Sequence, residues 1–265
     1  MNRPWLFLCT GFWLLFGALP AAAQVSLVVS PIRAELQVAA GASETNVIQV
    51  TNGSGKPARV KVSLADWTMD RHGNLTFSRA GTNPQSCAGW IQINPTDFRL
   101  DPGTREVRYT ITIPPGAKPG TYWTAVICEG MPVQENQPKG RRMAVHGRLA
   151  VVLYETLGNP PIKINFQDFK VNTKSKEPDF VLTLDNKGAG FSRLKKSSIT
   201  IKNSQGVQVA RLEVPDIPLL PGMTRDLNLK ADQPLPKGAY SAEAVLDVGR
   251  RDLLARKLNF AVGGK

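Results

Sequence analysis

The chain contains the segment Leu100-Asp-Pro-Gly-Thr-Arg-Glu-Val-Arg-Tyr109, and Leu220-Pro-Gly-Met-Thr-Arg-Asp-Leu-Asn-Leu229 resembles it. In each copy a Pro-Gly turn leads into residues that alternate between apolar and polar, a pattern typical of a half-buried β-strand. A second turn and a tyrosine follow, with Tyr122 20 positions after Pro102 and Tyr240 19 positions after Pro221. We therefore expect one sandwich motif to be used twice, with each tyrosine hydroxyl bonded to an upstream carbonyl as in a tyrosine corner.

Short alternating segments fill the chain on both sides of these two copies. The 265 residues include 23 Gly and 20 Pro, which separate the segments into turns and leave no long helical period with caps. The stretch Gly158-Asn-Pro-Pro161 interrupts the series and is typical of a linker. The sequence thus predicts an all-β protein of two tandem immunoglobulin-like sandwiches, residues 24–157 and 162–265, each expected to fold on its own.

The first 23 residues are typical of a secretory signal peptide. Arg3 precedes the apolar run Trp5–Leu19, and Pro20 and Ala21-Ala-Ala23 then supply a break and a small-residue cleavage site. The alternative is a transmembrane anchor, but the run is shorter than the roughly 20 residues that a span needs. We expect cleavage after Ala23, export to the periplasm, and no membrane-spanning segment in the mature chain.

Cleavage at that site changes the number of cysteines from three to two, because Cys9 lies in the leader. Cys87 and Cys128 remain, and an even number in an oxidising compartment predicts a single disulfide. The alternatives are two inert buried thiols or a pair active in disulfide exchange. Neither cysteine belongs to a CxxC motif, so redox catalysis is not expected.

Enzymatic chemistry is not expected from this sequence. His72 and His146, the two histidines, lie 74 positions apart, and GxSxG, HExxH, GxGxxG, P-loop and EF-hand motifs are absent. We therefore predict neither a metal site nor a cofactor. The formal net charge of the whole chain is +12, and Arg3 is the only charged residue in the leader. Export excludes nucleic acid as a partner, so the basic excess is interpreted as a solubility feature or as weak adhesion to anionic envelope surfaces. Alternatively, some of these charges flank a binding groove.

Residues 25–157 resemble the N-terminal domain of the periplasmic pilus-assembly chaperones, the PapD-like family. The resemblance rests on the order of elements and on these segments: Ser30-Pro-Ile-Arg33-Ala-Glu-Leu, Val-Thr-Asn52, Ile93-Asn-Pro-Thr-Asp-Phe98-Arg-Leu-Asp-Pro102-Gly and Gly120-Thr-Tyr-Trp-Thr-Ala-Val-Ile-Cys-Glu129. It implies binding of unfinished β-sandwich subunits by strand addition. The implied partners are pilin-like or other surface subunits and an outer-membrane usher. The competing hypothesis is an exported structural or adhesive module without chaperone activity.

The resemblance also implies which residues would bind a partner. The lending strand would be 143–154, whose apolar face carries Met143, Val145, Leu149 and Val151. That face could instead belong to the core. Arg33 matches an arginine that anchors the subunit's terminal carboxylate in the family.

The lysine that completes this anchor in the family has no counterpart here, because Val152 stands in its place. Arg148 is the nearest cation on the face of the strand that carries Val152, four residues away or about 13 Å along a strand. The carboxylate anchor is thus half present in the sequence.

Overall fold

The computed structural model describes residues 26–133, 147–249 and 253–263. Apart from one short 3-10 helix, η1 (Ala88–Trp90), the regular elements in these ranges are β-strands, which confirms the all-β prediction. The expected leader, Met143 and Val145 lie outside the described residues. No helix in the described ranges is long and apolar enough to cross a membrane.

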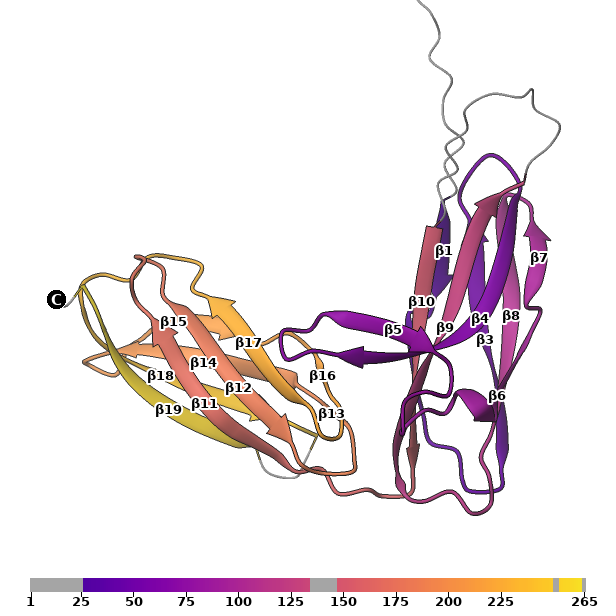
Figure 1. Cartoon of the computed structure of the whole chain (residues 1–265). Coiled ribbons are helices and arrows are strands. Elements are labelled where there is room, and N and C mark those ends of the chain that lie inside the picture. Colours follow the sequence, from indigo (N-terminus) through magenta and orange to yellow (C-terminus); the bar gives the residue numbers. More distant parts are fainter. Residues whose placement is uncertain (1–25, 134–146, 250–252, 264–265) are drawn as a thin grey trace, which may run out of the picture.

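The first ten strands form a two-sheet sandwich (Figure 1). One sheet has the order β1-β3-β8-β6, and the other has the order β2-β10-β9-β4-β5, with β7 also paired to β4. The chain crosses between the two sheets after β1, so β1 and β2 lie in different sheets. The strands are β1 (Leu27–Ser30), β2 (Arg33–Leu36), β3 (Ser43–Asn52), β4 (Ala58–Met69), β5 (Leu75–Arg79), β6 (Ile91–Asn94), β7 (Asp97–Leu100), β8 (Gly103–Thr112), β9 (Gly120–Pro132) and β10 (Gly147–Leu157).

The remaining nine strands build the second sandwich. Its sheets have the orders β11-β12-β17 and β15-β14-β18-β19, and β13 pairs with β16 beside them. The strands are β11 (Ile164–Asn172), β12 (Asp179–Asn186), β13 (Ser192–Arg193), β14 (Lys195–Asn203), β15 (Gln208–Glu213), β16 (Pro218–Leu219), β17 (Thr224–Lys230), β18 (Gly238–Asp247) and β19 (Leu254–Val262). The two-sandwich architecture predicted from the sequence is therefore confirmed.

Both predicted tyrosine corners are present. The Tyr122 hydroxyl donates a hydrogen bond to the carbonyl of Lys118 at 2.9 Å, and the Tyr240 hydroxyl donates one to Pro236 at 2.8 Å. Each tyrosine lies at the start of a strand, β9 or β18, with its hydroxyl tied to the turn before it. The repeated motif of the sequence thus corresponds to one local structure that occurs in both sandwiches.

A third apolar cluster lies between the two sandwiches, in addition to the core inside each of them. It is made of side chains from β4, β9 and β10 of the first sandwich together with Leu220, which is 1% exposed, and Phe191 of the second. The aromatic rings interlock: Trp67 lies edge-on to Tyr154 at 6.0 Å, and Tyr154 stacks on Phe191 at 4.7 Å between centroids. We call this cluster the interdomain core. In it, apolar side chains of each sandwich are buried against the other sandwich.

The β4–β5 hairpin adds a polar contact between the sandwiches, and Figure 1 shows it reaching from the first toward the second. At its tip the Arg71 guanidinium donates two hydrogen bonds to the Asp226 carboxylate, at 2.7 and 2.9 Å. The backbone N–H of Asp226 donates to the carbonyl of Arg71 at 2.7 Å. Side-chain and main-chain bonds therefore fix the same pair of residues across the interface.

The predicted linker, residues 158–161, is held in place by the second sandwich. The N–H of Gly190 donates to the carbonyl of Pro161 at 3.0 Å, and a Cβ atom at Gly188 would overlap that carbonyl oxygen. Glycine is required at Gly188 because the two backbones approach so closely. With a clamped linker and a shared core, we expect the sandwiches to depend on each other for stability, contrary to the expectation from the sequence.

The two cysteines are buried free thiols in this structure, so the predicted disulfide is not formed. Ser86 bridges to Trp123 of β9, and Cys128 lies five residues further along that strand. At about 3.3 Å per residue, Trp123 lies about 16 Å from Cys128 along β9, whereas the Cα atoms of a disulfide lie no more than about 7 Å apart. Spacing along the sequence could not show that both thiols are buried in the core of the first sandwich without being bonded to each other.

Free, unreactive thiols are therefore expected in the folded protein. Burial raises the pKa of Cys128 to about 11 and, with the nearby Glu155 carboxylate, also raises the pKa of Cys87, so little nucleophilic thiolate forms near neutral pH. A chain lacking residues 1–23 should show no fast reaction with a thiol-specific dye when folded and two reactive thiols once unfolded without reductant. Finding none after unfolding would show that the disulfide forms in the protein.

Candidate functional site

Strand β10 has an unpaired edge over its first half. It pairs with β9 along its whole length, from Gly147 opposite Gly130 to Leu157 opposite Gly120. On its other side β2 pairs only with the second half, beginning at Val152 opposite Arg33. Among the described residues, no strand is hydrogen-bonded to Gly147–Val151 on that side. We call these five residues the open edge.

Backbone groups of the open edge point outward at every second residue. The N–H of Val152 donates to the carbonyl of Ile32 at 3.1 Å, so the polar backbone of Val152 faces β2 rather than β9. Backbone direction alternates along a strand. The N–H and C=O groups of Arg148 and Ala150 must therefore face the same side as those of Val152, where they are available to another strand.

A surface cleft of about 580 Å³ lies beside the open edge. It opens between the beginning of β1, the turn after β3 and the beginning of β10. Leu27 and Leu149 supply half-buried apolar surface to it and also pack against the core of the first sandwich. The lining residues are Ser26, Leu27, Gly53, Ser54, Gly55, Gly147 and Leu149. An apolar side chain from an added strand would find an apolar contact here.

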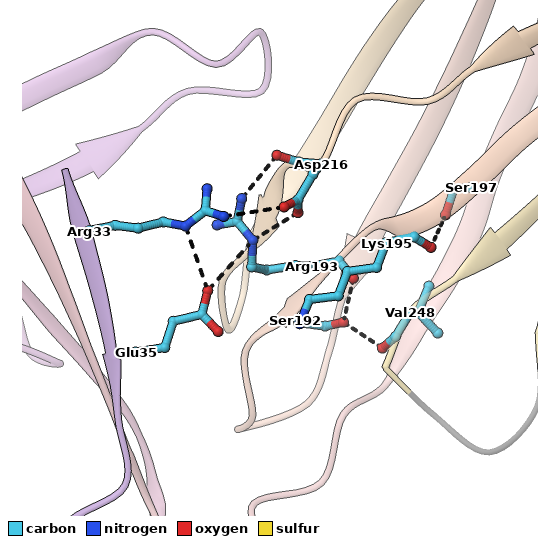
Figure 2. A network of polar contacts seen from close by, with 8 residues as sticks. All are labelled: Arg33, Glu35, Ser192, Arg193, Lys195, Ser197, Asp216 and Val248. Carbon is cyan, nitrogen blue, oxygen red and sulfur yellow. Dashed lines mark hydrogen bonds and ion pairs between the residues drawn. The ribbon is translucent and has the colours of Figure 1, made fainter. Parts of the chain in front are cut away.

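Arg33 stands where the open edge ends. As the Cα partner of Val152, it is the first residue of β2, and paired residues direct their side chains to the same face of a sheet. Its side chain is 45% exposed and lies 3.4 Å from the Asp216 carboxylate and 4.0 Å from that of Glu35 (Figure 2). The guanidinium thus keeps donors available on the solvent side.

Arg193 lies next to Arg33 but is almost completely buried, with 4% of its side chain exposed. It donates one hydrogen bond to the Asp216 carboxylate at 2.8 Å and another to the Asp216 carbonyl at 3.0 Å. Its Nε also lies 3.6 Å from Glu35. Hydrogen bonding from Arg193 is the main reason that the pKa of Asp216 is lowered, with the charge of Arg33 adding to it.

The predicted binding residues on β10 fall into different environments. Leu149 borders the cleft, as the hypothesis of a partner site requires. Val151 is completely buried in the core of the first sandwich, so at this position the alternative of a core role is correct. Arg148 is exposed, with its guanidinium 6.0 Å from the centroid of the Phe77 ring. Among the described residues, no carboxylate forms an ion pair with both Arg148 and Arg33.

The sequence analysis missed the neighbours of Arg33. Glu35 is two residues from Arg33 on β2, whereas Asp216 lies 183 positions away and reaches Arg33 only through the packing of the two sandwiches. Arg193 stands in the basic run Arg193-Leu-Lys-Lys196, where nothing local distinguishes a buried cation from solvated ones. The alternation of β13 is too short, at two residues, to indicate which side chain is buried.

No protein-family model and no curated protein matches this chain. Solved structures do resemble it. A chaperone–tip adhesin complex of CFA/I fimbriae biogenesis has 12% identity and a TM-score of 0.46, covering 91% of this chain and 100% of that one. The CsuC–CsuE chaperone–tip adhesion subunit pre-assembly complex of Acinetobacter baumannii archaic Csu pili has 14% identity and a TM-score of 0.45, covering 87% and 97%. The Salmonella enterica SafA pilin–SafB chaperone complex has 15% identity and a TM-score of 0.44, covering 91% and 99%.

Proposed function

We propose that this protein is a periplasmic chaperone that binds pilus or other surface subunits by strand addition to β10. The observation that carries the proposal is the open edge Gly147–Val151, which ends at the cation of Arg33. An extended segment beside this edge would bond to the outward-facing backbone groups of Arg148 and Ala150. Such main-chain bonds supply affinity in strand addition, while side-chain contacts at alternate positions supply specificity.

The position of Arg33 sets the direction of the added segment. β2 runs parallel to β10 and occupies its edge from Val152 onward, so an added segment has to stop there. A segment parallel to β10 would place its terminal carboxylate at Arg33, where a charge-assisted hydrogen bond forms. An antiparallel segment would bring a positively charged amino terminus to the same cation. Charge therefore favours a partner that ends its chain at Arg33.

Side chains of the added segment would contact the apolar residues that line the cleft. Leu149 and Leu27 lie beside the open edge, and every second residue of an added strand would face them. An alternating apolar pattern, as in a subunit with an unfinished β-sheet, satisfies this geometry. We infer that the partner is a β-rich subunit with a C-terminal strand of this type.

Arg33→Ala should weaken capture of such a subunit by roughly 10- to 100-fold, because a hydrogen bond to a charged group contributes roughly 1.5–3 kcal/mol and each 1.4 kcal/mol is tenfold. The measurement is a pull-down from periplasmic extract with the chain lacking residues 1–23. Captured proteins are identified by mass and quantified at several bait concentrations.

The matched control is Arg211→Ala. Arg211 is also about half exposed and, like Arg33, contacts a carboxylate, that of Glu213 at 2.8 Å, but it lies on β15 of the second sandwich. Capture should be unchanged in this variant. Equal capture by folded Arg33→Ala would remove the anchor from the proposal. Capture of no β-rich subunit by the unmodified chain would favour an adhesive module instead.

A further inference from the structure

Arg33 belongs to a cluster of four charged residues drawn from both sandwiches (Figure 2). Arg33 and Glu35 come from β2, Arg193 comes from β13, and Asp216 precedes β16. Two cations pair with two carboxylates in this cluster, and the charge of Lys195 also acts on Asp216. An incoming carboxylate at Arg33 would therefore meet a cation that already has internal partners.

The contacts within the cluster are unequal. Arg193 holds Asp216 with hydrogen bonds of 2.8 and 3.0 Å and is 4% exposed. Arg33 has only a 3.4 Å contact to Asp216 and a 4.0 Å contact to Glu35, and all three side chains are 40–45% exposed. Loss of the contacts to Arg33 would still leave Asp216 paired with Arg193. Because its contacts are the longer ones, Arg33 can exchange these carboxylates for that of a bound segment.

We propose that Asp216, together with Glu35, is a built-in competitor for the terminal carboxylate of a bound segment. The inference rests on the proposed function, since it assigns the residues that set the selectivity of the same anchor. A small free carboxylate has to compete with internal carboxylates already beside Arg33. A carboxylate at the end of a strand bound along the open edge is presented at a high effective concentration and displaces them. The cluster therefore selects carboxylates that are delivered by strand addition.

The test is Asp216→Asn, which keeps the shape of the side chain and an oxygen acceptor for Arg193 but removes the charge. The probe is a short labelled peptide of alternating valine and threonine, prepared with a free C-terminal carboxylate or with a C-terminal amide. Fluorescence anisotropy gives the affinity of each for the chain lacking residues 1–23. Asp216→Asn should strengthen binding of the carboxylate form roughly two- to fivefold, the range of an exposed ion pair, and leave the amide form unchanged.

The matched control is Asp97→Asn. The Asp97 side chain is 39% exposed and pairs with Arg59 at 2.6 Å, and it lies on β7, which is separated from β10 by β4 and β9. It should change neither affinity. Glu35→Gln is the second variant; it leaves the Arg193–Asp216 pair intact and should give a smaller gain, because its contact to Arg33 is longer. This variant decides the question if Asp216→Asn does not fold.

The outcomes separate this inference from the proposed function. If folded Asp216→Asn keeps the same preference for the carboxylate peptide while Arg33→Ala clearly loses it, Asp216 is not a competitor. Arg33 would still be the anchor of the terminal carboxylate. Equal affinities of the two peptides for the unmodified chain and for Arg33→Ala would overturn the anchor itself.

Discussion

Leu220→Lys is expected to destabilise the whole chain by at least about 3 kcal/mol. The Leu220 side chain is 1% exposed and packs into the interdomain core against residues of the first sandwich. The substitution removes a buried leucine, which by itself costs about 2–5 kcal/mol as Leu→Ala, and places an ammonium group in an apolar site. The measurement is a chemical denaturation curve followed by tryptophan fluorescence, because Trp67 and Trp123 lie in the same cluster.

Leu253→Lys is the control, because it makes the same replacement at a leucine that is 60% exposed. Its effect should stay within about 0.5 kcal/mol. Separate expression gives a second measurement: residues 24–157 alone should melt at a clearly lower temperature than the whole chain and bind an apolar dye. Two fragments that each fold as stably as they do in the whole chain would show that the interdomain core contributes little.

Ala150→Pro is expected to weaken subunit capture by about tenfold to a hundredfold while leaving the fold intact. The N–H of Ala150 faces the open edge, so its loss breaks no bond to β9 and removes one donor from the added strand. The proline ring would also project into the space that this strand needs. Proline is tolerated in folded sheets at edge positions of this kind.

Two further variants test the alternation on which this prediction depends. Leu149→Pro moves the ring by one residue, to an N–H that faces β9, and should strongly lower the melting temperature. Ala150→Ser retains the N–H and should capture normally. Normal capture by Ala150→Pro would place the partner elsewhere, whereas unfolding of Ala150→Pro together with a stable Leu149→Pro would reverse the assigned backbone direction.

Local pattern was sufficient for the all-β fold class, the long strands and the repeated tyrosine corner. Each depends on residues that are close in the chain: an alternation with a period of two, a Pro-Gly turn, and a tyrosine four positions after the carbonyl that it bonds. The resemblance of residues 25–157 likewise pointed to Arg33 and to the last strand of the first sandwich. These inferences needed no knowledge of which segments meet in space.

Tertiary structure alone decided which face of β10 is covered and by what. Both faces carry apolar residues, and the alternation could not show that Val151 enters one core while Tyr154 enters another, shared with the second sandwich. The contact of Arg33 with Asp216 and the burial of Arg193 depend on contacts between residues far apart in the chain. Such contacts arise from the packing of whole sheets, and a one-dimensional pattern holds no information about the distance between two strands that it predicts equally well.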